Sequence, residues 1–308
     1  MDSDQALNFA YNPRLLVADH LDVMARWRIK SAQARQDSIC QLDIPYGSSA
    51  FETLDIFPAK ERHAPTLLFI HGGYWRGSDK SEYSFIGKAW QDAGITAVLL
   101  NYALVPKVSL STIIEQITNA IIWVYQHIEE YSGNKKSLFL SGHSAGGYLA
   151  TKMMMTPWQE LLELNDQNLL QACFTMSGLY DLEPLTRASF IAADLGLTSS
   201  QAQSLSVINP SNPKNTLSKN ATVYAAIGND EGQGFHDQQN LLKRYWPDAL
   251  ARSFILQNCN HFTIMDELGD KDSLLFQAVL QMIGFANDRY SIKKSIKKSN
   301  KKSYWEFR

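Results

Sequence analysis

Short apolar segments of strand length alternate along the chain with longer segments whose apolar residues recur at helical spacing. Strands are predicted at 52–59, 66–73, 95–104, 137–142, 172–178, 222–230 and 252–260. Helices are predicted over 81–94 and 110–133, from Gly146 onward, and over about 235–246. Apolar strands that alternate with helices are typical of a parallel sheet whose two faces are both covered. The pattern therefore predicts an α/β fold.

Two segments lie outside this alternation. Residues 183–218 are rich in Ser, Asn and Pro, and we expect them to form a small cap within a single domain that spans residues 1–290. The remaining residues, 291–308, carry six lysines in a repeat of Lys, Lys and Ser. Such a Lys-rich tail is typical of a solvated chain terminus, which is the main interpretation. An anchor for anionic surfaces is the second interpretation of the same charges.

Composition restricts the classes of protein that fit this pattern. The 308 residues are 45% hydrophobic, which is enough for one large α/β domain. The formal net charge is −2, so no overall positive field attracts nucleic acid or an anionic membrane. The three cysteines lie far apart, and the first residues have neither a basic start nor an apolar stretch. These features predict reduced thiols, no signal peptide, no membrane span and a cytoplasmic protein.

A serine between glycines, in Gly142-His143-Ser144-Ala145-Gly146, stands where a predicted strand ends and a predicted helix begins. A Gly-x-Ser-x-Gly turn holds its serine in a strained conformation and points the hydroxyl out of the sheet. The amide groups at the start of the following helix favour negative charge that develops nearby. The motif alone also occurs by chance, but its position between strand and helix predicts that Ser144 is a nucleophile.

A serine nucleophile needs a base, and the base needs a carboxylate that orients it. In chains with this motif the carboxylate and then the histidine follow the serine. His261 follows the last predicted strand and is the predicted base, whereas the helical spacing around His236 indicates an ordinary histidine. Two adjacent carboxylates, Asp230 and Glu231, end the preceding strand. Counting three residues from Gly228 favours Glu231 as the acid, with Asp230 as its competitor.

The predicted strand over 66–73 leads into His71-Gly72-Gly73-Tyr74-Trp75. Glycines at such a position let backbone N–H groups face an anionic oxygen without a side chain in the way. The predicted donors of this oxyanion hole are the N–H groups of Gly73, Tyr74 and Ala145, with His71 orienting the loop and Trp75 packing. The sequence contains no cluster with the spacing of metal ligands, and the predicted chemistry uses neither a metal nor an organic cofactor.

Together these motifs resemble the kynurenine formamidase (arylformamidase) family of α/β-hydrolases, including its esterase-like bacterial branch. The likeness extends over most of the chain and includes YNPR, HGGYWRGSDKSEYSFI, GHSAGG, SGLYDLEPL and HFTIMDEL. It implies the α/β-hydrolase fold, with a mostly parallel central sheet, helices on both faces and a small cap. It also implies that the nucleophile, acid and base fall on Ser144, Glu231 and His261. The acid of the family is often Asp, so a glutamate at position 231 is a departure of this chain from the family pattern.

The resemblance implies a serine hydrolase that cleaves N-formyl-kynurenine to kynurenine and formate. A carboxylesterase that acts on short-chain esters with the same residues is the alternative, and a catalytically idle binding protein is a remote third hypothesis. The expected partner is a small ester or formamide, with no nucleic acid and no membrane, and a homodimer is one assembly left open. Formyl-kynurenine carries a carboxylate, so a formamidase pocket should present a cation or several donors. Arg76 and Lys80 lie near the oxyanion motif in the sequence.

Overall fold

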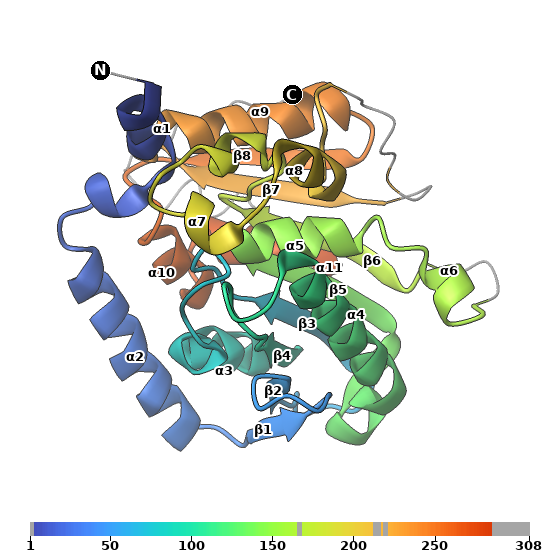
Figure 1. The fold of residues 1–308 in the computed structure, drawn as a ribbon. Coiled ribbons are helices and arrows are strands. Elements are labelled where there is room, and N and C mark those ends of the chain that lie inside the picture. The colour runs from blue at the N-terminus through green and yellow to red at the C-terminus, as the bar shows by residue number, and fades with distance from the viewer. Residues whose placement is uncertain (1–2, 165–167, 212–216, 218–220, 285–308) are drawn as a thin grey trace.

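A sheet of eight strands forms the centre of the molecule in the part of the chain that the structure, a computed structural model, describes: residues 3–164, 168–211, 217 and 221–284 (Figure 1). The strand order is β1-β2-β4-β3-β5-β6-β7-β8. β2 pairs antiparallel with β1 and β4, whereas all other neighbouring strands are parallel. The strands are β1 (Gln41–Pro45), β2 (Thr53–Phe57), β3 (Ala64–Ile70), β4 (Thr96–Leu100), β5 (Gly133–His143), β6 (Leu170–Met176), β7 (Val223–Gly228) and β8 (Leu250–Leu256).

Helices cover both faces of this sheet, which has a separate core on each face. Successive side chains of a strand point to opposite faces, so in β3 Leu68 and Ile70 join one core while Leu67 and Phe69 join the other. The longer helices that contribute to the first core include α4 (Leu110–His127), α5 (Ala145–Met153) and α9 (Gln233–Tyr245). Those of the second are α2 (His20–Gln36), α3 (Ser84–Asp92), α10 (Ile264–Gly269) and α11 (Leu274–Ile283).

The predicted α/β architecture is confirmed, with differences at the ends of some elements. The helix predicted over 110–133 ends at His127 and is followed by η3 (Ile128–Tyr131). β5 then begins at Gly133, earlier than the strand predicted over 137–142, because Gly133 already pairs with Ala64 of β3, and a register shift separates this pair from the regular pairing that starts at Leu138. The remaining short elements of the described chain are η2 (Lys80–Tyr83), α6 (Trp158–Leu161), η4 (Glu183–Thr186), α7 (Ala192–Leu195) and α8 (Ser199–Leu205).

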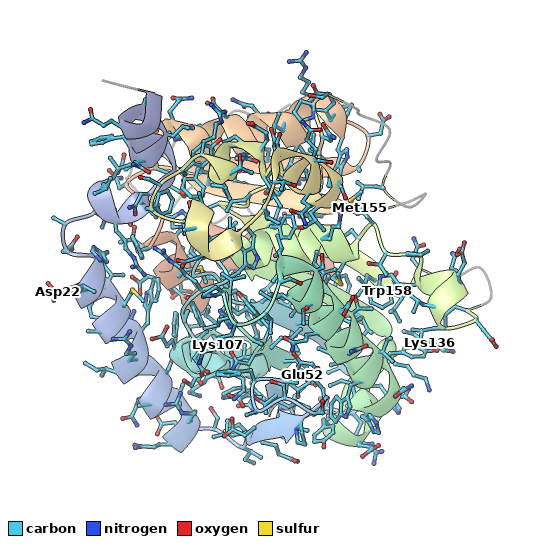
Figure 2. The ribbon with its side chains drawn as sticks, viewed as in Figure 1. Asp22, Glu52, Lys107, Lys136, Met155 and Trp158 are labelled. Carbon is cyan, nitrogen blue, oxygen red and sulfur yellow. The ribbon has the colours of Figure 1, made fainter. Side chains whose placement is uncertain are left out.

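An N-terminal segment, defined here as residues 3–36, packs against helices of the rest of the molecule and was not predicted. It contains α1 (Ser3–Tyr11), η1 (Pro13–Leu15) and α2. α2 buries Val23, Trp27, Ser31 and Ala34, which recur every three or four residues and so lie on one helical face. On the opposite face the side chain of Asp22 points away from the molecule (Figure 2). This segment forms one wall of a pocket that Ser144 also lines.

The segment predicted to be a cap is described only over 183–211 and at residue 217. It contains η4, α7 and α8, and its residue Phe190 lines the same pocket as Ser144. Tyr148 and Lys152 of α5 each donate a hydrogen bond to the Leu205 carbonyl oxygen, which holds α8 over α5. The Lys-rich tail, 291–308, lies outside the described residues. None of the helices in the described ranges has the length and apolarity needed to cross a membrane.

Candidate active site

Ser144 lies at a sharp turn between β5 and α5, as the motif predicts. Its backbone has φ 56° and ψ −118°, a strained conformation for a residue with a side chain. The turn is tight because α5 lies directly against β3: a Cβ on Gly146 would stand 2.0 Å from the Ile70 carbonyl oxygen. A Cβ on Gly142 would stand 2.2 Å from the Gly146 carbonyl oxygen. Both glycines are therefore required by close backbone contacts rather than by backbone conformation.

Gly146→Ala is expected to lower the free energy of unfolding by about 1–3 kcal/mol or more, because the added methyl group meets backbone atoms that cannot move aside without disturbing β3. Urea denaturation measures the effect. Gly77→Ala is the matched control, since a Cβ there would approach no atom closer than 4.0 Å. Equal stability of the two variants would contradict this account of the turn.

His261 lies in the loop between β8 and α10 and faces Ser144. Its Nε2 is 3.0 Å from Ser144 Oγ, and the imidazole is buried. Asn260 shapes this loop, because its side-chain oxygen accepts hydrogen bonds from the N–H groups of Phe262 and Thr263. Phe235 packs against the imidazole, with 4.4 Å between ring centroids. Both the loop and the packing hold the ring in the orientation that joins it to the serine.

Glu231, and not Asp230, is the carboxylate that contacts His261. Its Oε2 lies 2.7 Å from His261 Nδ1, and its side chain is fully buried. Its Oε1 accepts hydrogen bonds from the Ser177 hydroxyl at 2.6 Å and from the Gly228 N–H at 2.8 Å. Asp230 is exposed, and its carboxylate accepts a hydrogen bond from the neighbouring Asn229 side chain. The sequence offered both carboxylates, and the structure brings only Glu231 to the histidine.

The loop after β3 turns sharply beside Ser144. Gly73, Tyr74 and Trp75 all have positive φ values of 105°, 52° and 56°, and the two aromatic residues are outliers for this region. The Gly73 carbonyl accepts hydrogen bonds from the N–H groups of Arg76 and Gly77, which closes the turn. Trp75 is fully buried and packs edge-on against Tyr148, with 5.3 Å between ring centroids, so the prediction that it packs is confirmed.

His71 supports this loop from beneath and does not face the serine. Its ring nitrogens lie 2.9 Å from the Gly72 carbonyl oxygen and 3.0 Å from Asn101 Oδ1, and the ring stacks on Tyr102. Asn101 in turn donates a hydrogen bond to Asp79. Burial lowers the pKa of His71, which favours the neutral ring. The geometry agrees with a residue that orients the loop.

Three backbone N–H groups near Ser144 donate no hydrogen bond within the part of the chain that the structure describes. Among the hydrogen bonds formed by the described residues, none uses the N–H of Gly73, Tyr74 or Ala145. Gly73, Tyr74 and Ser144 line one pocket, and Ala145 is the first residue of α5. A negatively charged oxygen near Ser144 would be stabilised by such donors and by the amino end of the helix.

His143, the residue before Ser144, is a second buried histidine at the site. Its Nε2 donates a hydrogen bond to the His261 carbonyl oxygen at 2.8 Å, and the two rings are 4.7 Å apart. Burial, and next the charge of His261, lower the pKa of His143 well below its usual value. His143 is therefore neutral, and its contact ties the turn of the serine to the loop of the histidine. The sequence indicated no role for it.

A pocket of about 620 Å³, a volume that includes solvent outside its open mouth, lies beside Ser144 and His261. Five of its fifteen lining residues are Phe, Trp or Tyr, and the lining comes from five separate parts of the chain: 12–27, 73–83, 143–144, 190 and 261–262. The residues that complete the lining are Asn12, Pro13, Arg14, Met24, Trp27, Gly73, Tyr74, Arg76, Ser78, Tyr83, His143, Phe190 and Phe262. An apolar pocket with a few polar groups beside a reactive centre is the usual form of a small-molecule site.

Sequence reasoning missed the wall formed by the N-terminal segment. Asn12-Pro13 was a local signal for a helix start, since Asn caps helices and Pro favours the first turn. The Asn12 side chain does accept a hydrogen bond from the Arg14 N–H. That wall is held against the rest of the site because the Tyr74 hydroxyl donates to the Tyr11 carbonyl oxygen. Gly232 and Gly234 allow α1 to approach, since a Cβ on either would lie within 2.8 Å of the Ala10 carbonyl oxygen.

The two cations expected near the pocket have different positions. Arg76 lines it, but the Lys80 side chain is buried elsewhere, with Nζ 2.7 Å from Asp55 of β2 and 2.5 Å from Asp43 of β1. Asp55 is equally buried, whereas Asp43 is exposed. The sequence left the directions of both side chains open, and the structure uses the charge of Lys80 to join the antiparallel edge of the sheet to the loop after β3. Within the described residues no cluster of three or more His, Cys, Asp or Glu side chains could hold a metal ion.

Lys80→Met is expected to lower the free energy of unfolding by about 3–5 kcal/mol, because it leaves the buried carboxylate of Asp55 without its partner. Lys88→Met is the matched control, since Lys88 forms an exposed ion pair with Asp92 that is worth at most about 1 kcal/mol. Urea denaturation of both variants, with Lys80→Met/Asp55→Leu as a partial rescue, checks the assignment. Similar losses in the two single variants would rule it out.

The strand order, the turn at Ser144 and the contacts of Glu231 and His261 define the α/β-hydrolase fold, and the protein is a hydrolase of this class. The family model BD-FAE matches residues 54–224. Because this match covers more than half of the 308 residues, the chain belongs to the BD-FAE family.

Relatives of this chain are named hydrolases. It is 28% identical to kynurenine formamidase of Danio rerio over 262 residues, which are 83% of this chain and 87% of the relative. It is 25% identical to kynurenine formamidase of Drosophila melanogaster, over 85% of this chain and 87% of the relative. Among solved structures, a candidate thioesterase from Silicibacter sp. TM1040 has a TM-score of 0.75 and 26% identity, and the match covers 90% of this chain and 98% of that one. Esterase B from Lactobacillus Rhamnosis has a TM-score of 0.66 and 18% identity over 89% and 95%. The resemblance to the kynurenine formamidases is confirmed.

Proposed function

We propose that this protein is a serine hydrolase that removes the formyl group from N-formyl-kynurenine, with Ser144, His261 and Glu231 as its catalytic triad. The observation that carries the proposal is the continuous line of contacts from Glu231 Oε2 through the His261 ring to Ser144 Oγ, with distances of 2.7 and 3.0 Å. The formamidase names of relatives that match over most of the chain support the choice of substrate. The aromatic pocket beside the serine supports an aryl leaving group.

The first half of the proposed reaction forms a formyl-enzyme. Ser144 Oγ attacks the formyl carbon while His261 Nε2 takes its proton, and Glu231 stabilises the imidazolium that results. The oxygen of the tetrahedral intermediate becomes an anion and accepts hydrogen bonds from the N–H groups of Gly73, Tyr74 and Ala145. The intermediate then collapses and breaks the C–N bond. The proton on Nε2 passes to the departing nitrogen, and kynurenine leaves as the free amine.

The second half releases formate and restores the enzyme. A water molecule gives a proton to His261 Nε2 and attacks the formyl ester on Ser144. The same three N–H groups stabilise the second oxyanion. When this intermediate collapses, the C–O bond to Ser144 breaks, Oγ recovers its proton from Nε2, and formic acid leaves and ionises. Neither half consumes a cofactor, so the residues of the chain account for all atoms and protons.

A carboxylesterase that acts on short-chain esters is the second candidate. The esterase names of structural neighbours favour it, and the same triad would cleave a C–O bond in place of the C–N bond. The test compares kcat/KM for N-formyl-kynurenine with kcat/KM for short p-nitrophenyl esters. A formamidase is expected to favour N-formyl-kynurenine, whereas a clear preference for the esters would support the second candidate.

The remote third hypothesis, an idle binding protein, makes a different prediction. A serine that is activated by its neighbours reacts with a fluorophosphonate probe, whereas an idle one does not. We expect the protein to be labelled at Ser144 and to lose the label when Ser144 is replaced by alanine. Failure of the unaltered protein to react would overturn the proposed mechanism together with both substrates.

A further inference from the structure

The pocket contains two arginines, and they differ in how their charges are used. Arg76 Nη1 donates to Asp194 Oδ2 at 2.7 Å and to the Phe190 carbonyl oxygen at 2.5 Å. The Arg76 charge is therefore neutralised by a carboxylate of the segment between β6 and β7. An arginine engaged in this way holds the pocket wall together and has little attraction left for a ligand anion.

Arg14 also lines the pocket, but its guanidinium is engaged with no protein group among the described residues. The backbone N–H of Arg14 donates a hydrogen bond to Asn12 Oδ1, and this bond does not involve the side chain. The residue is exposed, so it stands where the pocket opens to solvent. Asn12 and Pro13 set the backbone of this short turn, and the buried ring of Pro13 fixes it against the protein. The position of Arg14 is thus defined while its charge is free.

We propose that Arg14 is a specificity-determining residue that binds a carboxylate on the leaving group of the substrate. This inference rests on the proposed function, because it assumes that the scissile carbonyl lies at Ser144 and the leaving group extends along the aromatic walls. A guanidinium presents paired N–H donors that match the two oxygens of a carboxylate. The favoured substrate class is therefore an aryl amide or ester whose leaving group carries a carboxylate, such as an aryl-substituted amino acid, rather than one that lacks it.

The experiment measures a preference ratio, defined as kcat/KM for a carboxylate-bearing substrate divided by kcat/KM for its counterpart without the carboxylate. One pair is N-formyl-kynurenine and its α-carboxamide. A second pair is 3-acetoxybenzoate and phenyl acetate, which share the acetyl group. Both members of a pair are measured on one enzyme preparation, so partial misfolding of a variant cancels in the ratio. The variants are Arg14→Gln, which removes the charge, and Arg14→Lys, which keeps it.

We expect Arg14→Gln to lower the preference ratio about ten- to hundredfold, because a charge-assisted hydrogen bond is lost only for the carboxylate-bearing substrate of each pair. Arg14→Lys should recover part of the preference. Arg26→Gln is the matched control, since Arg26 is an exposed arginine of the same segment that does not line the pocket. It removes the same charge from the protein and should leave the ratio unchanged.

Two outcomes overturn the assignment of Arg14. In the first, the preference ratio of Arg14→Gln stays within twofold of the original. In the second, the ratio falls equally in Arg14→Gln and Arg26→Gln, which would mean that the net charge alone is responsible.

The formamidase proposal fails in a different way. If the unaltered protein cleaves the acetyl esters but not N-formyl-kynurenine, the substrate is wrong, and the ester pair still decides whether Arg14 binds a carboxylate.

Discussion

Ser144→Ala is expected to lower kcat about a million-fold and to leave the folded structure nearly as stable as before. Removal of the nucleophile leaves His261 with no hydroxyl to activate, and loss of a triad serine typically has an effect of this size. The free energy of unfolding should change little. The substitution removes the contact between Ser144 Oγ and His261, but the Ser144 N–H keeps its hydrogen bond to the Met176 carbonyl oxygen. Alanine also occupies the strained backbone conformation no worse than serine.

The matched control for this prediction is Ser141→Ala in β5, the strand that leads into the turn of Ser144. Ser141 is fully buried, and its hydroxyl has no hydrogen-bond partner in the described structure. Ser141→Ala also removes one hydroxyl oxygen, but from a position three residues before Ser144. We expect kcat for this variant to stay within a few fold of the original. Near-normal hydrolysis by Ser144→Ala, measured after exclusion of contaminating esterases, would show that another residue is the nucleophile.

Glu231→Gln is expected to lower kcat/KM about ten-thousand-fold, which is the scale of losing the carboxylate that orients a catalytic histidine. The amide can no longer compensate the imidazolium charge, and it lets the ring take the wrong tautomer. The surrounding contacts amplify the effect. Glu231 Oε1 is held by Ser177 and by the Gly228 N–H, so a Gln side chain that keeps its carbonyl oxygen there presents its NH₂ group to His261.

Asp230→Asn provides the neighbouring control. Asp230 is exposed, and its carboxylate contacts the Asn229 side chain, so the variant removes a negative charge one residue from Glu231 without changing the contact to His261. We expect a loss of less than about tenfold, since an exposed charge acts on the site only through solvent-screened electrostatics. If Asp230→Asn is the crippled variant and Glu231→Gln is not, the acid is Asp230 and the line of contacts has been misassigned.

The sequence predicted the central strands because they are apolar throughout, and it predicted Ser144 and His261 because a short motif and the order of the strands specify them. It did not predict β1, whose residues are mostly exposed and so lack an apolar pattern. It favoured Glu231 as the acid but did not exclude Asp230, since the side chains of two neighbouring carboxylates in one turn differ only in their direction. Hydrogen bonds to Glu231 from Ser177 and Gly228 make that choice in the folded protein.

The walls of the pocket were the least predictable part of the site. Arg14 and Trp27 reach it because a segment from the other end of the chain packs across the site, and no local pattern encodes a contact between residues more than a hundred positions apart. The position of Lys80 was not predictable either, because its closeness to the oxyanion motif in the sequence did not fix where its side chain lies. Its buried pairing with Asp55 depends on how the sheet edge folds. Local motifs identify reacting groups, whereas long-range packing decides what surrounds them.

The docking of the N-terminal segment also has a consequence for the order of events during synthesis. The first residues to leave the ribosome include Arg14 and Trp27, but α1 packs on α9 and on the glycines at 232 and 234, which are translated more than two hundred codons later. Domains fold as their sequence becomes available, so α2 can pack on η2 and α3 soon after those elements emerge, whereas α1 has to wait until α9 has been translated. A nascent chain that has already formed the turn at Ser144 therefore still lacks the contact between α1 and α9, and the wall that carries Arg14 is among the last parts of the pocket to be fixed in place.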